Sequence, residues 1–350
     1  MSAGADLGGL GPGAISIVAE LADDRVCSVR VRSSRPAHLT RLFRGRPAAE
    51  VAPLAGRLFS LCGLSHAFAA SRAIAAARGD IRKTTPQDLV ALDCERLSET
   101  LRALTTMAED AVPPTALRAV LALTRELAAC DARERAATAA RLRAETTKLG
   151  LLDAMGGDTP FGKLSRALAR SPAIAASAPD ALRAEDDALV LEGIRAQGEN
   201  FSAAPSIAGR APETGAFARH WRETDLSRGA ICARFSARMI DLDRLVGRLS
   251  NGADDSSRSD APAAREAYCA VETSRGELYH WVRLTPDDRI ENYAIVAPTE
   301  WNFHPAGPFV AALLGARIPR AAAAQTITRL AGLFDPCVAF HVELREAAYA

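Results

Sequence analysis

The sequence predicts an α+β fold with a mostly helical centre, an N-terminal β-hairpin and a C-terminal strand region. Residues 14–34, AISIVAELADDRVCSVRVRSS, hold two alternating runs around an Asp-Asp pair, which is typical of a hairpin. From about residue 54 to residue 250, apolar side chains recur mostly at three- and four-residue spacing, which indicates helices. Residues 268–299 return to strand-like runs around a Pro-Asp-Asp turn, which predicts a β-meander.

The helical centre contains two long candidate helices. Residues 85–110 begin with the start signal Thr-Pro, and residues 113–150 form a helical stretch that starts after Pro-Pro and ends in glycine. Short helices are expected around residues 306–332. The polar segment 251–264, NGADDSSRSDAPAA, is expected to be a mobile loop between the helical centre and the second strand region, and the Gly-rich residues 1–13 a flexible lead.

Composition excludes several classes of function. Lys and Arg total 43 against 42 Asp and Glu, so charge gives no reason to expect nucleic acid or an anionic membrane as a partner. The seven cysteines lack the dense spacing of a disulfide-stapled domain, which favours reduced thiols. The first residues do not resemble a signal peptide, and no run of about 18 apolar residues follows. A soluble, cytoplasmic protein is expected.

Near the C-terminus, the stretch LFDPCVAFHVEL at residues 333–344 contains a candidate metal ligand. Cys337 lies between a proline and a small apolar run, four residues before His341. A lone cysteine is more often a small buried hydrophobe than a metal ligand, so neighbouring residues must supply the evidence for a metal site. Cys62 and His66, at positions i and i+4 of a predicted helix, form a second candidate pair, although helices also produce this spacing by chance.

Both cysteines lie in segments that resemble motifs of the nickel-iron hydrogenase large subunit. The segment FDPC is similar to the family's last motif, in which Asp-Pro-Cys begins a Cys-x-x-Cys pair followed by histidine. The segment RLFSLCGLSHAFAASRA is similar to Arg-x-Cys-Gly-x-Cys-x-x-x-His. Arg57, Cys62 and His66 match this motif, whereas Phe59 stands in place of its first cysteine.

Three further segments extend the resemblance over residues 41–341, although about residues 85–200 match no motif. Residues 205–219 resemble Glu-x-Gly-x-x-Ala-Arg, residues 272–281 resemble Glu-Ala-Pro-Arg-Gly followed by His-Trp, and residues 292–315 resemble Asn-Tyr, Pro-Thr-Thr-Trp-Asn and Gly-Pro in order. The resemblance implies one interwoven domain over residues 1–350. It also implies cofactor contacts from the residues that match the family's cofactor-binding positions, namely Arg275, Pro298 and Thr299.

The departures from the family motifs exclude an intact nickel-iron centre, which needs four thiolates. Phe59 and Phe340 stand where the other two cysteines would be. In the family, iron carries two cyanides and one carbon monoxide, so Cys62 and Cys337 could hold that unit without nickel. His66 and His341 are further candidate ligands, although His341 lies two residues earlier than the family histidine.

The chain is therefore similar to the HupK/HoxV accessory proteins. This resemblance implies a non-catalytic scaffold or chaperone in hydrogenase maturation that transiently holds Fe(CN)2(CO). Its partners would be maturation proteins and the hydrogenase large subunit. Two alternatives stay open: a metal-free structural stand-in that binds maturation factors or a hydrogenase subunit, and a redox enzyme with a mononuclear site. Glu272 is a candidate ion-pair partner of Arg275. The scaffold hypothesis predicts that the sulfurs of Cys62 and Cys337 face one pocket.

Overall fold

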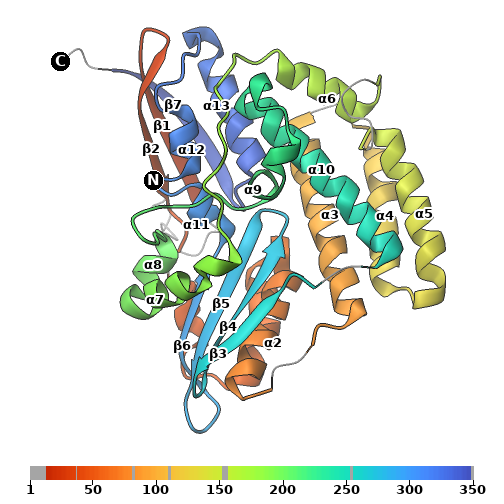
Figure 1. Ribbon diagram of the computed structural model, residues 1–350, viewed down its shortest axis with the longest axis vertical. Helices are drawn as coiled ribbons and strands as arrows, with labels where there is room; N and C mark the ends of the chain where they lie inside the picture. The colour runs from red at the N-terminus through yellow and green to blue at the C-terminus, as the bar shows by residue number, and fades with distance from the viewer. Residues whose placement is uncertain are drawn as a thin grey trace, which may run out of the picture.

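Two β-sheets and a layer of long helices make up the chain (Figure 1). The computed structural model describes residues 13–36, 38–80, 83–108, 112–151, 157–252 and 255–347. The strands are β1 (Ala14–Ala22), β2 (Arg25–Ser33), β3 (Arg258–Ala263), β4 (Glu266–Thr273), β5 (Gly276–Leu284), β6 (Ile290–Val296) and β7 (Ala339–Glu346). The α-helices are α1 (Val51–Leu58), α2 (Gly63–Ala77), α3 (Pro86–Ala108), α4 (Pro114–Ala129), α5 (Ala132–Leu149), α6 (Pro160–Ala169), α7 (Asp187–Gln197), α8 (Glu199–Ala203), α9 (Ala216–His220), α10 (Gly229–Asn251), α11 (Pro298–Asn302), α12 (Pro308–Leu313) and α13 (Arg320–Phe334). These elements confirm the predicted α+β class.

The N-terminal hairpin is confirmed, and it gains a third strand from the other end of the chain. Strands β1 and β2 pair antiparallel around a turn in which Asp23 has a φ of 51°. Strand β7 pairs parallel with the free edge of β1, so the sheet order is β2-β1-β7. The alternation of β1 follows the sheet, because Ile15, Ile17 and Ala19 are fully buried in the main core. Both ends of the chain therefore build one sheet.

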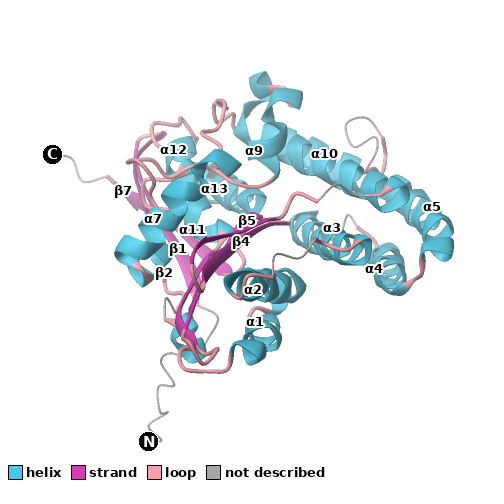
Figure 2. Cartoon of the chain, turned by 60° about the horizontal axis from the view of Figure 1, so that its bottom comes forward, coloured by secondary structure: helices cyan, strands magenta, loops and turns pink. Residues whose placement is uncertain are grey.

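The second sheet contains the predicted meander, in the order β3-β4-β5-β6 with all pairs antiparallel. Helix α2 covers one face, while α7 and α11 lie on the other (Figure 2). Alternate residues of β4 therefore enter different cores: Cys269 packs against the alanines of α2, and Tyr268 packs in the cluster that contains Phe201. The centre of this sheet is therefore buried on both faces.

The helical layer differs from the sequence prediction at one break. The predicted helical stretch 113–150 divides into α4 and α5, since Cys130 is extended and Asp131 caps the new helix. The Asp131 carboxylate accepts hydrogen bonds from the backbone N–H groups of Arg133 and Glu134 at 2.7 and 3.1 Å. Gly150, with a φ of 87°, ends α5 as predicted.

The segment 251–264 is also shorter as a loop than predicted. Helix α10 continues to Asn251, and residues 258–263 form the edge strand β3, which pairs with β4. An edge strand tolerates the polar, Pro-containing composition that suggested a loop, because only one side of it joins the ladder. The expected flexible lead at residues 1–13 lies outside the described residues except for Gly13.

A sharp corner between α1 and α2 places Cys62. The short 3₁₀ turn Ser60–Cys62 connects the two helices. Their backbones approach each other closely at two glycines, since a Cβ atom on Gly63 would lie only 2.5 Å from the carbonyl oxygen of Gly56. Cys62 therefore occupies the N-cap position of α2. Within the described residues, no single helix has the length and hydropathy of a membrane span; the segments Ala48–Leu58 and Ser60–Ala77, bent by 98°, reach them only together.

Candidate functional site

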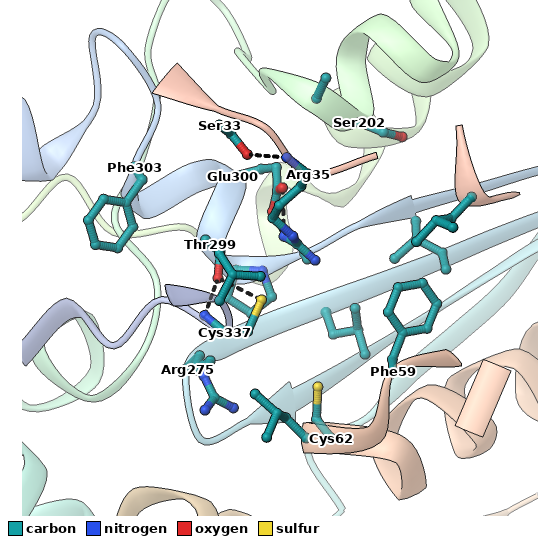
Figure 3. A pocket seen from close by; sticks show the side chains of 18 of the residues that line it. Ser33, Arg35, Phe59, Cys62, Ser202, Arg275, Thr299, Glu300, Phe303 and Cys337 are labelled. Atoms are coloured by element: carbon teal, nitrogen blue, oxygen red, sulfur yellow. Dashed lines mark hydrogen bonds and ion pairs between the residues drawn. The ribbon is translucent and has the colours of Figure 1, made fainter. Parts of the chain in front are cut away.

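The two sheets meet at a cavity of about 380 Å³ that both candidate cysteines line (Figure 3). Its walls come from the end of β2, the corner between α1 and α2, helix α8, the β4–β5 turn, the start of α11 and the segment between α13 and β7. Cys62 and Cys337 lie far apart in the sequence but both line this cavity. The prediction that they face one pocket is therefore confirmed. Of the other predicted site residues, the cavity is lined by His66, Arg275, Pro298 and Thr299.

Cys337 is held against the start of α11. The Thr299 hydroxyl lies 3.4 Å from the Cys337 sulfur, and the backbone N–H of Cys337 donates to the same hydroxyl oxygen at 3.3 Å (Figure 3). Pro298 and Thr299 begin α11, where the fixed φ of proline suits the first helical position. The threonine thus fixes both the backbone and the sulfur of Cys337.

Cys62 is held from the other side by the start of α2. The carboxylate of Glu95, on α3, accepts hydrogen bonds from the backbone N–H groups of Leu64 and Ser65 at 2.8 and 2.9 Å. Burial raises the pKa of the Cys62 thiol to about 12, although the nearby Arg275 and Arg35 act in the opposite direction. At neutral pH this thiol is protonated, so a metal that binds its sulfur must displace a proton.

Arg275 lies in the two-residue turn between β4 and β5 and is buried. Its guanidinium is 3.4 Å from Glu99 and 3.5 Å from Asp335, and its Nε has no hydrogen-bond partner among the described residues. The proposed pair with Glu272 is wrong, because Glu272 pairs with Arg219 instead. Arg275 therefore places a guanidinium on the wall of the cavity, but two carboxylates lie against it.

His66 lines the cavity, but one of its ring nitrogens is already engaged. Its Nδ1 lies 2.9 Å from Nε2 of His280, whose Nδ1 lies 2.6 Å from the hydroxyl of Tyr293. Burial lowers the pKa of His66 well below its ordinary value, so the ring is neutral. Phe59 stacks on this ring at a centroid distance of 4.0 Å. The phenylalanine that replaces the family's first cysteine therefore fills space beside His66.

His341 does not reach the cavity, which corrects its prediction as a ligand. In strand β7 the alternate residues Phe340 and Val342 pack toward the core, so His341, opposite Ser16, is exposed on the other face. Phe340 lines a neighbouring cavity with Arg102 and Met107 rather than the cavity of the cysteines. The ligand prediction followed the family's Cys-x-x-Cys…His motif and did not consider that this segment forms a strand with alternating faces.

Sequence reasoning missed two charged residues of the cavity, Arg35 and Glu300. Nη1 of Arg35 lies 2.6 Å from each carboxylate oxygen of Glu300 (Figure 3). Glu300 stands where the motif Pro-Thr-Thr-Trp-Asn has its second threonine, and this substitution was the one available signal. Arg35 follows the hairpin without any motif, so only the fold brings it to the cavity.

The cavity is not a complete site for a bare metal ion. In the part of the chain that the structure describes, no group of three or more His, Cys, Asp and Glu side chains could hold one. Soft sulfur donors from Cys62 and Cys337 suit iron, but two donors leave most coordination positions open. The donor set therefore fits a metal that arrives with ligands of its own.

Known proteins resemble this chain in sequence over nearly its full length and also in fold. The nickel-dependent hydrogenase family matches residues 224–343. The hydrogenase expression/formation protein HupK of Rhizobium leguminosarum bv. viciae is 38% identical over 370 residues, covering 97% of this chain and 99% of its own. HoxV of Cupriavidus necator, also named a hydrogenase expression/formation protein, is 34% identical, and the match covers 91% of this chain and 93% of HoxV.

A solved structure gives the same architecture. A variant of the [NiFeSe] hydrogenase from Desulfovibrio vulgaris Hildenborough superposes with a TM-score of 0.67 over 94% of this chain and 99% of that chain, at 15% identity. This likeness concerns the fold alone, whereas the two accessory proteins match nearly the full length at 34% and 38% identity. The chain belongs to the HupK/HoxV family of hydrogenase expression/formation proteins and has the fold of the hydrogenase large subunit.

Proposed function

We propose that the protein is a non-catalytic scaffold in NiFe-hydrogenase maturation that transiently holds the Fe(CN)2(CO) unit between Cys62 and Cys337. The unit would then pass to the hydrogenase large subunit. The observation that carries this proposal is the convergence of the two cysteines, from opposite ends of the chain, on one cavity. The relatives of this protein are named for hydrogenase expression and formation, which supports a role in maturation.

The cavity suits this cargo chemically. Two thiolates and three diatomic ligands together supply five donors to iron, so the missing cysteines are not needed and no nickel is required. Cyanide nitrogens accept hydrogen bonds, and Arg275 and Thr299 offer donors on the walls of the cavity. With phenylalanine at position 59 and only two of the described cysteines lining the cavity, hydrogen turnover is not expected. The scaffold would act in the cytoplasm together with maturation proteins, without nucleic acid or membrane.

A second candidate function is a metal-free stand-in that binds maturation factors or a hydrogenase subunit. One observation favours it: the described residues contain no group of three or more His, Cys, Asp and Glu side chains that could hold a metal ion. In this case the two cysteines would be dispensable.

Infrared spectroscopy of protein isolated without oxygen separates the two functions, because cyanide and carbonyl stretches have little protein background. We expect both bands in the wild type and their loss in Cys62→Ala and Cys337→Ala, since one thiolate cannot chelate iron. Cys94→Ala is the matched control. Its thiol is buried in α3 away from the cavity, and its loss would cost only about 1 kcal/mol.

The scaffold proposal fails if the wild type, expressed with its maturation system, carries neither band. It also fails if the Cys62 and Cys337 variants retain the bands and still support hydrogenase maturation.

A further inference from the structure

The Arg35–Glu300 pair lies within the cavity and has no counterpart in the motifs that relate this chain to the hydrogenase large subunit. Arg35 descends from the end of β2 beside Glu300, on the side of the cavity that holds Thr299 and Cys337, with Arg275 and Cys62 across from it (Figure 3). The Arg35 and Glu300 side chains are 17% and 12% exposed, so the ion pair is largely shielded from water. Shielding makes its charges effective over the width of the cavity.

The backbone of Arg35 is fixed before its side chain enters the cavity. The adjacent Ser34 bonds twice to Ala14 at the start of β1: its N–H donates to the Ala14 carbonyl at 2.9 Å, and its hydroxyl oxygen accepts from the Ala14 N–H at 2.9 Å. Gly13, with a φ of 76°, passes so close that a Cβ atom there would lie 2.6 Å from the Cα of Arg35. The position of Arg35 is therefore set by the sheet and not by a free loop.

Only one end of the Arg35 guanidinium is used. Nη1 contacts both oxygens of Glu300, whereas Nε and Nη2 have no hydrogen-bond partner among the described residues. Burial lowers the pKa of Arg35, but the charge of Glu300 and its hydrogen bond to the guanidinium outweigh this effect and raise it overall, and the Cys337 and Cys62 sulfurs add to the rise in their thiolate forms. The guanidinium therefore lies within electrostatic reach of both sulfurs.

Arg275, by contrast, already faces two carboxylates. Glu99 and Asp335 lie 3.4 and 3.5 Å from it, so its charge is largely balanced inside the protein. A cargo of iron(II), two cyanides and two thiolates carries a net charge of −2, which needs further positive charge nearby. Among the described arginines that line the cavity, Arg35 has one carboxylate partner and two unused nitrogens, so it can supply this positive charge and these donors.

We propose that Arg35 is a second anion-recognition residue of the cavity, which donates from Nε and Nη2 to a small linear anion of the cyanide class. Glu300 is a positioning residue that holds the guanidinium through Nη1. This inference rests on the proposed function for the identity of the natural ligand, but the site itself can be tested without iron. Arginine suits the role because its planar fork keeps one edge on Glu300 while another edge faces the ligand.

The test uses potassium thiocyanate, a linear anion with a C≡N stretch, on the metal-free full-length chain. Binding is measured by calorimetry and the stretch by infrared spectroscopy. The double variant Arg35→Met/Glu300→Thr removes both charges, so no unpaired buried charge remains, and its affinity is expected to fall about tenfold or more. Arg35→Lys keeps the charge without the planar fork, so thiocyanate should still bind, with a displaced stretch.

Glu300→Gln gives a result of the opposite sign. It keeps the shape of the side chain but removes the competing negative charge, so thiocyanate should bind more tightly than to the wild type. A purely structural ion pair predicts equal affinity and an unmoved stretch in all these variants, and that result overturns the inference. If the double variant does not fold, Arg35→Lys and Glu300→Gln decide the question alone.

The two proposals can fail separately. Absence of cyanide and carbonyl bands from anaerobically isolated wild type overturns the proposed function and leaves Arg35 as an anion site if thiocyanate binding depends on it. Presence of those bands, with cyanide stretches unchanged by Arg35→Lys and thiocyanate binding unchanged in every variant, overturns the role of Arg35 and leaves the scaffold standing.

Discussion

Arg275 shows how a single residue can serve both the cavity and the core. Its guanidinium lines the cavity between the cysteines and also lies between Glu99 of α3 and Asp335, the residue that ends α13. Asp335 in turn lies 3.5 Å from Arg238 of α10. The residue expected only to contact the cargo therefore also joins three helices to the β4–β5 turn.

Replacing Arg275 should therefore affect folding as well as cargo binding. Arg275→Leu takes one cation away from two buried carboxylates, which keep Arg102 and Arg238 as partners, and it should lower the free energy of unfolding by about 1 to 3 kcal/mol. Arg275→Lys, which keeps the charge, should lose clearly less. Urea unfolding of the metal-free protein measures both values. Equal stability of the leucine variant and the wild type would show that Arg275 has no structural role.

At the scale of elements, the start of α2 is anchored by its neighbour α3. Glu95 accepts from the backbone N–H groups of Leu64 and Ser65, two and three residues after Cys62, where the helix has no side-chain N-cap of its own. The anchor fixes the first turn of α2 and, with it, the direction of the Cys62 sulfur. The position of the Cys62 sulfur and the stability of the first turn of α2 thus depend on one carboxylate from a different helix.

We expect Glu95→Ala to lower the free energy of unfolding by about 1 to 3 kcal/mol, because buried N–H groups lose their acceptor. Under the proposed function, the variant should also retain less iron than the wild type. Glu126→Ala, which removes an exposed carboxylate paired with Arg141, should change stability by less than about 1 kcal/mol. Urea unfolding and the intensity of the cyanide bands test both effects; a fully stable and fully loaded Glu95→Ala variant would contradict them.

Helix α2 and strand β5 are joined through the buried pair His66 and His280. Burial lowers the pKa of His280 from 6.5 to about 3, and that of His66 also falls. The folded state therefore binds protons more weakly than the unfolded state. The stability contribution is present above pH 6.5 and is lost as the pH falls from there toward 3, by at most about 1.4 kcal/mol per pH unit for each histidine.

Replacing His280 should therefore make the protein less sensitive to acid. Urea unfolding between about pH 7 and pH 5 should give a shallower decline for His280→Gln than for the wild type, even if the variant is less stable at pH 7. Parallel declines would show that this pair does not titrate on unfolding.

The elements that could be predicted from the sequence are those defined by local patterns. Alternation around a turn was enough for the hairpin and the meander, and motif order was enough to bring Cys62 and Cys337 together. Strand β3 was missed because edge strands tolerate loop-like composition. Strand β7 was missed because its partner β1 lies at the other end of the sequence. Arg35 reaches the cavity only through the fold, so no local pattern could reveal it.

At the scale of the whole molecule, β1 is the central strand of a sheet built from both ends of the chain. Strand β7 covers one edge of β1 along its length, and its side chains Phe340, Val342 and Leu344 pack against the main core. The segment that carries Cys337 lies between this strand and α13. The cavity and the sheet therefore depend on the same pairing.

A chain that ends at Val338 should lose cooperative folding, because it exposes the edge of β1 together with apolar core surface. A chain that ends at Ala347 is the control, since it keeps β7 and the hydrogen bond from the Ala347 N–H to Leu21 at 2.9 Å. Soluble yield and urea unfolding compare the two. A shorter chain that unfolds as cooperatively and at the same urea concentration as the control would contradict this dependence.

The parallel pairing of β1 with β7 also sets an order of events during synthesis. Strand β1 leaves the ribosome more than 300 residues before its partner β7, and contacts of such high sequence separation form late. Until residue 346 has emerged, Cys337 has no fixed position opposite Cys62. Under the proposed function, iron would therefore be delivered to a translated and folded chain and not to a nascent one.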